Sequence, residues 1–262
     1  AGLAARTKPV DDLRPERLNR LRVQADLQAQ ARLQPAEKPP FVLVEPGEDP
    51  VWGHGFEQIP EPDSADIFLD FEGHPFWRPD RGLFFLFGFV AADEPGESRY
   101  HPIWAFDEAE ERDGVAELVR YIEDRRASHP GMHVYHYNHT ERSALESLTA
   151  QHAVAEGALA DLVDRGVFVD LLLVARNAVQ VGVEGYGLKH LERLTDYERS
   201  HEIDKGAGAV VAFDLYGQDG DPAHLDAIAA YNEDDVRATL ALRDWLVAQR
   251  PAGLAWRTVA VE

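Results

Sequence analysis

The chain has 262 residues, of which 45% are hydrophobic and 28% are charged, a composition typical of a globular protein and not of a disordered one. Its 47 acidic residues outnumber the 26 lysines and arginines, and the net charge of −21 excludes a protein that binds nucleic acid through a global positive charge. Because the sequence contains no cysteine, disulfide scaffolds, cysteine-ligated zinc and thiol catalysis are excluded as well.

The cellular setting can be predicted from the same sequence. No apolar run approaches the ~20 residues of a membrane-spanning helix, and the N-terminus lacks the charged and apolar regions of a signal peptide. We therefore expect a cytoplasmic protein with no membrane partner. The sequence starts at Ala1 and its only methionine is Met132, so we also expect either a processed chain or a domain of a longer protein.

The N-terminal part of the chain is predicted to be one helix followed by a linker. Apolar residues recur at helical spacing over residues 14–33. Prolines then interrupt residues 35–62 and exclude a long helix there, which favours an extended linker with one short strand at Phe41–Val44. The expected organisation is a helical lead-in at 1–34, a linker at 35–62, a compact domain at 63–250 and a tail at 251–262.

The compact domain is predicted to begin with three strands. Alternating apolar residues in Asp66–Glu72 indicate a strand, and the apolar run Leu83–Ala92 indicates a second strand covered on both faces. A third strand is expected at Ser98–Ala105, and the short connections favour an antiparallel meander. The later predicted elements are a helix over 107–126, a strand at Met132–Tyr137, helices over 140–150 and 156–165, a strand at Val167–Asp170, and helices over 171–178, 185–194 and 222–249. This order predicts an α/β domain with a mixed five-stranded sheet and helices on both faces, and it resembles the RNase H-like fold.

Two acidic residues on the first predicted strand of this domain are candidate metal ligands. Asp70 and Glu72 are two residues apart, so their side chains point to the same face of a strand. Like charges at this separation push one pKa upward unless a cation lies between them, and hard oxygen ligands suit Mg²⁺ or Mn²⁺. The alternative is that both carboxylates face solvent on an edge strand.

The helix predicted over 222–249 has a third acid on its apolar side. Asp235 lies within the apolar stripe of this helix, where a carboxylate is costly unless it is paired, protonated or bound to metal. Tyr231 lies one turn earlier, so its hydroxyl can converge with the Asp235 carboxylate. The neighbouring Asp234 points ~100° away, which predicts a solvated side chain. The alternative for Asp235 is a buried acid satisfied by an arginine or by backbone donors.

A fourth acid, Glu141, opens the helix predicted over 140–150 and shares a face with Ala144 and Leu145. The alternative is purely structural, because the helix dipole favours an acid in the first turn by ~0.3–1 kcal/mol. Together the four acids predict a site with several carboxylates. In such sites, two cations ~3.5–4 Å apart can clamp the attacking and leaving oxygens of a phosphodiester displacement.

Two of these patterns resemble motifs of the DEDD exonuclease superfamily: the D-x-E strand with Asp70 and Glu72, and the Y-x-x-x-D helix from Tyr231 to Asp235, whose tyrosine is similar to the DEDDy branch. More closely, the chain resembles the RNase H-like domain of the RecB-like putative nuclease family. The similar segments extend from about 66 to 246 and are DIFLDFEGHPF, LFFLFGFV, VYHYNHTERSALESL, FVDLLLVAR, EGYGLKHLERLTDYER and YNEDDVRATLALRDWL. The resemblance implies a module of a larger DNA-processing protein, with a RecB-like nuclease region upstream and sometimes a helicase downstream as partner domains.

The resemblance also implies two Mg²⁺ or Mn²⁺ ions and a role for each matching residue. It implies that Asp70 bridges both metals, that Glu72 and Asp235 complete the shell of the first metal, and that Tyr231 orients the attacking water. Glu141 takes the place where the superfamily usually has an aspartate that acts on the second metal. Glutamate is one methylene longer, so the chain departs from the family pattern at this position.

Four further residues are candidates for substrate binding. His74 and Trp77 follow the D-x-E strand, and Trp77 either stacks on a base, an interaction worth ~1–3 kcal/mol, or covers the core. Asn138 either holds a ligand or water at the metal site or simply ends the predicted strand. Lys189, on a predicted helix, either contacts phosphate or is solvated or salt-bridged.

Three functions fit these patterns. The first is a metal-dependent nuclease, most simply a 3′–5′ exonuclease on single-stranded nucleic acid, with DNA favoured over RNA. The second is an RNase H-like interaction module with weak or no turnover, which the net charge of −21 and the glutamate at position 141 also fit. The third is an endonuclease of the same fold that selects branched or looped substrates.

Overall fold

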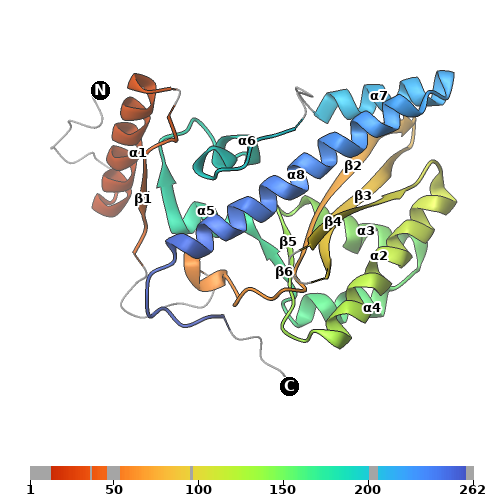
Figure 1. Cartoon of the computed structure of the whole chain (residues 1–262), viewed down its shortest axis with the longest axis horizontal. Helices are drawn as coiled ribbons and strands as arrows, with labels where there is room; N and C mark the ends of the chain where they lie inside the picture. Colours follow the sequence, from red (N-terminus) through yellow and green to blue (C-terminus); the bar gives the residue numbers. More distant parts are fainter. Residues whose placement is uncertain (1–12, 36, 46–53, 95–96, 201–205, 258–262) are drawn as a thin grey trace. The chain divides into compact units, whose positions relative to one another are not determined.

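The structure is a computed structural model that describes residues 13–35, 37–45, 54–94, 97–200 and 206–257 (Figure 1). The chain divides into two compact units. The first unit takes its residues from the ranges 1–59, 172–197 and 241–257, and the second takes most of its residues from 60–171 and 198–240. The domain boundaries expected from the sequence stay a prediction.

The second unit is built on a five-stranded sheet with the strand order β4-β3-β2-β5-β6. The strands are β2 (Ile67–Arg78), β3 (Arg81–Glu94), β4 (Glu97–Trp104), β5 (Val134–His136) and β6 (Phe168–Asp170). Strands β2, β3 and β4 form the predicted antiparallel meander, whereas β5 runs parallel to β2, and β6 runs parallel to β5. The predicted α/β class with a mixed sheet is confirmed.

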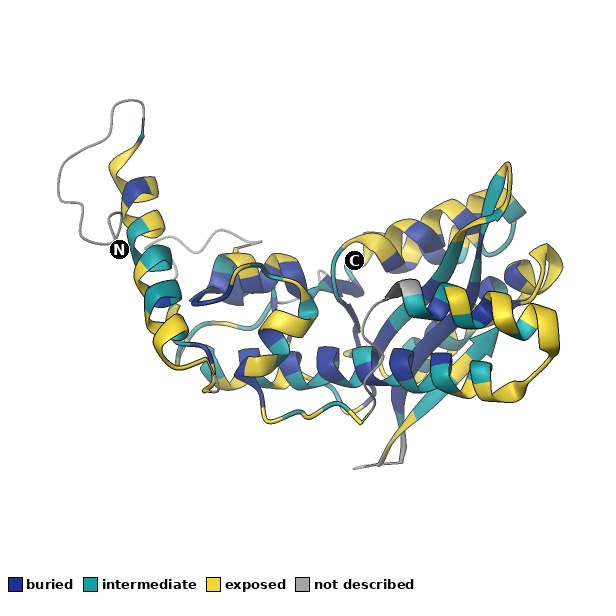
Figure 2. Cartoon of the chain, turned by 90° about the horizontal axis from the view of Figure 1, so that it is seen from above, coloured by how far each residue is buried: buried dark blue, intermediate teal, exposed yellow. Residues whose placement is uncertain are grey.

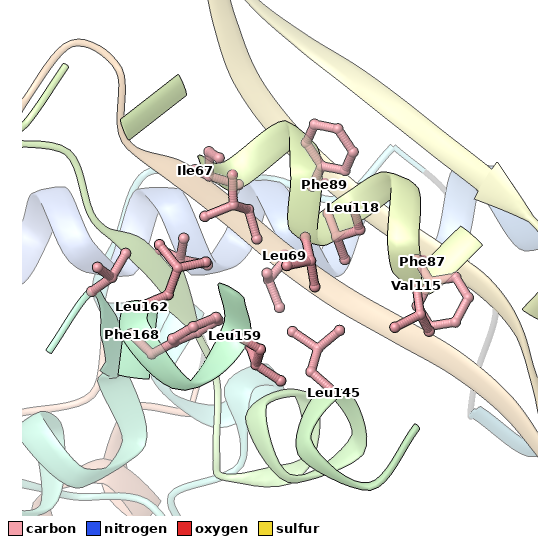
Figure 3. Packing of buried hydrophobic residues seen from close by; sticks show 14 of the residues in the cluster. Ile67, Leu69, Phe87, Phe89, Val115, Leu118, Leu145, Leu159, Leu162 and Phe168 are labelled. Atoms are coloured by element: carbon pink, nitrogen blue, oxygen red, sulfur yellow. The ribbon is translucent and has the colours of Figure 1, made fainter. Parts of the chain in front are cut away.

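One face of this sheet packs against the main hydrophobic core. Three helices pack on this core: α2 (Glu108–Ser128), α3 (Thr140–His152) and α4 (Glu156–Asp164). Ile67 and Leu69 of β2 point into the core together with Phe87 of β3, and Leu118 and Leu145 reach it from the helices (Figure 3). Because side chains alternate along a strand, this placement directs Asp70 of β2 away from the core.

The opposite face of the sheet is covered by α7 (Gly206–Asp219) and by the first part of α8 (Pro222–Gln249). Phe85 of β3 stacks on Phe213 of α7 with ring centroids 4.2 Å apart, and Ile228 of α8 joins the same cluster. Burial of β3 on both faces confirms the prediction from its apolar run. The longer helices, in contrast, are buried on one side only. Figure 2 shows buried positions along one side of these helices and exposed positions along the other.

The first unit contains α1 (Pro15–Leu33), β1 (Phe41–Leu43), most of α5 (Leu171–Ala178), β7 (Val179–Val181) and α6 (Leu188–Leu191). It also contains two 3₁₀ helices, at Gly55–Gln58 and Glu192–Leu194, and the C-terminal part of α8. The predicted N-terminal helix and short strand are confirmed, and β1 pairs antiparallel with β7. The helix predicted over 185–194 is shorter, because Gly187 takes an extended conformation at its N-cap. In the described ranges, no helix is both long and apolar enough to cross a membrane.

Candidate metal centre

Three acidic side chains converge on the α7–α8 side of the sheet. Asp70 and Glu72 come from β2 and Asp235 comes from α8, and each offers a carboxylate oxygen within 4.8 Å of the others. The strand period places the first two on one face, and α8 covers that face with its Asp235 side. The structure thus brings Asp235 to two acids that lie more than 160 residues earlier in the sequence.

The electrostatics of this cluster are unfavourable without a cation. Burial raises the pKa of Asp70 well above its ordinary value, and the negative charges of Glu72, Asp235 and Glu141 raise it further. The positive charge of Arg199 opposes this rise only in part. Since a divalent cation favours the ionised form of nearby carboxylates, the donor set fits a hard metal ion such as Mg²⁺ or Mn²⁺.

Asp70 is held in place by Asn232, a fully buried residue of α8. The Nδ2 atom of Asn232 donates to Oδ2 of Asp70 at 2.9 Å and to its main-chain oxygen at 3.1 Å. The Tyr100 hydroxyl in turn donates to Oδ1 of Asn232 at 2.8 Å. This network fixes the amide orientation and leaves the other oxygen of the Asp70 carboxylate outside these hydrogen bonds.

Room for this amide depends on Gly88 of β3. Gly88 pairs with Asp70 in the β2–β3 register, and a Cβ atom at this position would lie 1.6 Å from Oδ1 of Asn232. Neither Asn232 nor Gly88 was predicted from the sequence. The available signal was a glycine inside a long apolar strand, which often marks the close approach of another group.

Asp235 has two polar neighbours. An Nη atom of Arg199 lies 2.6 Å from its Oδ1, which is the arginine pairing considered as the alternative for this acid. The Tyr231 hydroxyl also donates a hydrogen bond to Asp235, as the helical spacing predicted. Burial is the main cause that raises the pKa of Tyr231, and the charges of Asp235 and Glu72 add to the rise. The tyrosine is therefore a hydrogen-bond donor at neutral pH.

The prediction of a solvated Asp234 is wrong. Its side chain is buried, and Oδ1 accepts hydrogen bonds from the backbone N–H and the hydroxyl of Ser200, both at 3.1 Å. The angular position of Asp234 on α8 is as expected, but the segment that contains Ser200 covers that side of the helix. Helical periodicity alone cannot show which segment packs on the second face.

Glu141 lies close to the three-acid cluster but outside it. Its side chain is buried, and its Oε2 has no hydrogen-bond partner among the residues that the structure describes. Nδ1 of His136 lies 3.7 Å from this oxygen. Its charge contributes to the raised pKa of Asp70. Because an unsatisfied buried carboxylate oxygen is costly, Glu141 fits a role as a ligand of a metal or of metal-bound water.

Asn138 lies two residues after β5 and has a strained conformation. Its φ of 78° lies in the left-handed region, and its backbone N–H donates to Oδ1 of Asp170 at 3.0 Å. Its side chain contacts His139 and Thr140. These contacts match the interpretation that Asn138 terminates the strand and positions the start of α3.

The remaining substrate-binding candidates are dispersed. His74 pairs with Asp214 of α7 at 3.2 Å, and Trp77 packs against the apolar cluster of α7 and α8 with the Arg78 guanidinium 4.2 Å from its ring centroid. The ring of Trp77 therefore contributes to covering the core. Lys189 is exposed on α6 and belongs to the first unit, so the structure does not assign it to the metal centre.

The fold and the acidic cluster together are those of a nuclease-type domain. A family profile for the RNase H superfamily matches residues 67–247, which include the whole sheet, the three converging acids and Glu141. The chain belongs to the RNase H superfamily, whose members are generally nucleases that act on nucleic acid with divalent metal ions. Comparison with curated proteins and with solved structures gives no match.

Proposed function

We propose that the protein is a metal-dependent nuclease that hydrolyses phosphodiester bonds, acting as a DEDDy-type 3′–5′ exonuclease on single-stranded nucleic acid, with DNA favoured over RNA. The observation that supports this best is the convergence of Asp70, Glu72 and Asp235 within 4.8 Å. Burial and the neighbouring acids raise the pKa of Asp70, and such a perturbed group in a site is typical of function.

Asp70, Glu72 and Asp235 are the proposed ligands of a Mg²⁺ or Mn²⁺ ion, and Glu141 is the proposed contact of a second ion. When bound, such ions stabilise the charge on the attacking and leaving oxygens of a phosphodiester. Asn232 fixes the orientation of Asp70, and outer hydrogen bonds of this kind orient metal ligands. Because the raised pKa of Tyr231 keeps its hydroxyl protonated and that proton is donated to Asp235, the hydroxyl oxygen is proposed to orient the attacking water as a hydrogen-bond acceptor.

The nuclease test combines metal binding with cleavage. Titration with Mn²⁺ is expected to raise the melting temperature of the chain, since a ligand that binds only the folded state stabilises it. Loss of terminal nucleotides from a 5′-labelled single strand is expected in the same buffer, and EDTA is expected to stop it. Asp70→Asn is expected to remove both responses, whereas Asp113→Asn, at an exposed acid of α2, is the matched control.

Cleavage of an end-blocked circular single strand would instead indicate the endonuclease. If Mn²⁺ leaves the melting temperature and the substrate unchanged, the nuclease proposal is contradicted.

A catalytically inactive interaction module is the second candidate. The ion pair between Arg199 and Asp235 favours it, because the arginine already supplies a positive charge to one of the three acids. This candidate predicts no saturable response to Mn²⁺. In either case we propose a cytoplasmic protein whose other domains include a RecB-like nuclease region, accompanied in some proteins of this kind by a helicase.

A further inference from the structure

A pocket in the first unit is rich in positive charge, although the chain as a whole has a net charge of −21. The pocket has a volume of about 750 Å³ and lies between α1, α5 and β7. Its charged lining residues are Arg14, Arg17, Arg20, Arg176 and Glu16. Four arginines and one glutamate give it a local net charge of +3.

The pocket arginines are attached to a fixed framework. Arg14, Arg17 and Arg20 follow one another at intervals of three residues, which places neighbours of the series on one side of α1. Gln24 of α1 donates to the main-chain oxygen of Val181 at 2.6 Å. In the other direction, the side chain of Gln180 donates to the main-chain oxygen of Arg20 at 2.9 Å. These bonds hold α1 against β7 and keep the arginines at the pocket.

None of the four pocket arginines forms an ion pair with an acidic side chain among the residues that the structure describes. Several exposed arginines elsewhere in the described chain do pair with acids. Examples are Arg112 with Asp113, Arg142 with Glu146 and Arg165 with Asp161. Arg20 makes one long hydrogen bond of 3.5 Å to the main-chain oxygen of Arg176. Most guanidinium donors of the pocket are thus available to an external anion.

An aromatic ring lies beside these guanidinium groups. The hydroxyl of Tyr186 donates to the main-chain oxygen of Val179 at 2.9 Å and accepts from the N–H of Val181 at 3.2 Å, so the ring is fixed. Burial raises the pKa of Tyr186, and the charges of Arg20 and Arg176 partly oppose this rise, which places both arginines within electrostatic reach of the ring. The pocket therefore combines phosphate-binding groups with a flat apolar surface.

We infer that this arginine pocket binds the phosphodiester backbone of single-stranded nucleic acid. Guanidinium groups bind phosphate oxygens bidentately, and an aromatic ring beside them provides a stacking surface for a base. Charges farther away than ~8 Å are largely screened at physiological ionic strength, so the local charge of +3 outweighs the distant acids for a bound strand. The choice of nucleic acid over an acidic protein rests on the proposed function and on the tyrosine ring.

The test is equilibrium binding of fluorescein-labelled single-stranded DNA to the full chain in EDTA, followed by anisotropy at several salt concentrations. The pocket variant is Arg17→Gln with Arg20→Gln, and the control is Arg112→Gln with Arg165→Gln, which changes the net charge equally. Loss of two phosphate contacts is expected to weaken binding roughly tenfold or more and to reduce the salt slope by ~1.4. The control is expected to bind within about twofold of the wild type, because charges outside the pocket are screened. Replacing both pocket arginines by lysine is expected to keep the salt slope.

Three results would overturn the inference. The first is a pocket variant that binds DNA as tightly as the wild type, and the second is a control variant that loses as much DNA affinity as the pocket variant. The third is displacement of the DNA by poly-glutamate at equal charge concentration. The measurement also separates this inference from the proposed nuclease activity. If the pocket variant loses DNA binding and the wild type shows no cleavage, the nuclease proposal is refuted and the binding role of the pocket is supported. Cleavage together with normal binding by the pocket variant would refute the pocket alone.

Discussion

Asn232 donates hydrogen bonds from one amide nitrogen to both the carboxylate and the main-chain oxygen of Asp70, at 2.9 and 3.1 Å. Asn232 lies on α8, the helix that also carries Asp235, and it fixes the side chain of Asp70 on β2. The two elements that carry the proposed metal ligands are therefore connected by an uncharged amide. Removal of an outer-sphere partner of a metal ligand commonly costs 10–100-fold in metal affinity or activity. The contact therefore leads to a direct prediction.

Asn232→Ala is expected to weaken Mn²⁺ binding roughly 10–100-fold, because Asp70 loses the donor that orients it. Tyr100→Phe removes only the hydrogen bond to Oδ1 of Asn232 and is expected to have a smaller effect. Calorimetric titration with Mn²⁺ measures both affinities. Unchanged affinity in Asn232→Ala would show that the amide has only a structural role.

Gly88→Ala is expected to disturb the same contact from the other side. The added Cβ would lie 1.6 Å from Oδ1 of Asn232, and overpacking of this kind typically costs ~1–3 kcal/mol. We expect a lower urea midpoint together with weaker Mn²⁺ binding. Gly157→Ala in α4 is the control, because no atom lies within 4 Å of its added Cβ and alanine stabilises a helix relative to glycine. A neutral effect of Gly88→Ala would contradict the packing argument.

Local patterns predicted most of the fold, because they depend on short-range periodicity. Alternation in β2 and the apolar run in β3 identified both strands, and the proline-rich segment was correctly given one short strand. The missed elements lack such signals. α7 begins with glycines, which have low helix propensity, and β7 has only three residues, whose strand conformation depends on the distant partner β1.

The candidate site shows the same division. Asp70 and Glu72 were identified because residues two apart share one face of a strand, and Asp235 because a carboxylate in the apolar stripe of a helix is unusual. The structure places all three together. The burial of Asp234 and the contact of Asn232 could not be predicted, since both depend on the segment that packs against α8. The catalytic roles of these residues stay predictions.

Asp70→Asn is expected to stabilise the metal-free protein while removing its response to metal. The native state holds a proton on Asp70 at pH values where the unfolded chain, with an ordinary pKa of 3.8, has lost it. Stability therefore falls as the pH rises from that value through the raised pKa of the folded state. Asparagine has no such penalty and still accepts a hydrogen bond from Asn232.

In EDTA, the melting temperature of Asp70→Asn is expected to exceed that of the wild type by roughly 2–4 °C at neutral pH, equivalent to about 1 kcal/mol. The difference is expected to shrink toward pH 4, where the unfolded wild-type chain also begins to bind a proton at this position. Addition of Mn²⁺ is expected to reverse the order. A wild type that is more stable than the variant in EDTA at neutral pH would contradict the raised pKa.

Arg199→Gln is expected to tighten Mn²⁺ binding about tenfold, equivalent to about 1.4 kcal/mol. Arg199 lies 2.6 Å from Asp235, and its positive charge lowers the pKa of Asp70. It therefore competes electrostatically with a bound cation and also stabilises the metal-free cluster. Arg199→Gln is accordingly expected to melt at a lower temperature than the wild type in EDTA, and saturating Mn²⁺ is expected to raise its melting temperature more than that of the wild type.

Calorimetric titration of wild type and variant with Mn²⁺ tests the predicted affinity directly, with Arg112→Gln as the control for net charge. Weaker Mn²⁺ binding by Arg199→Gln would show that the arginine helps to build the site instead of competing with its ion.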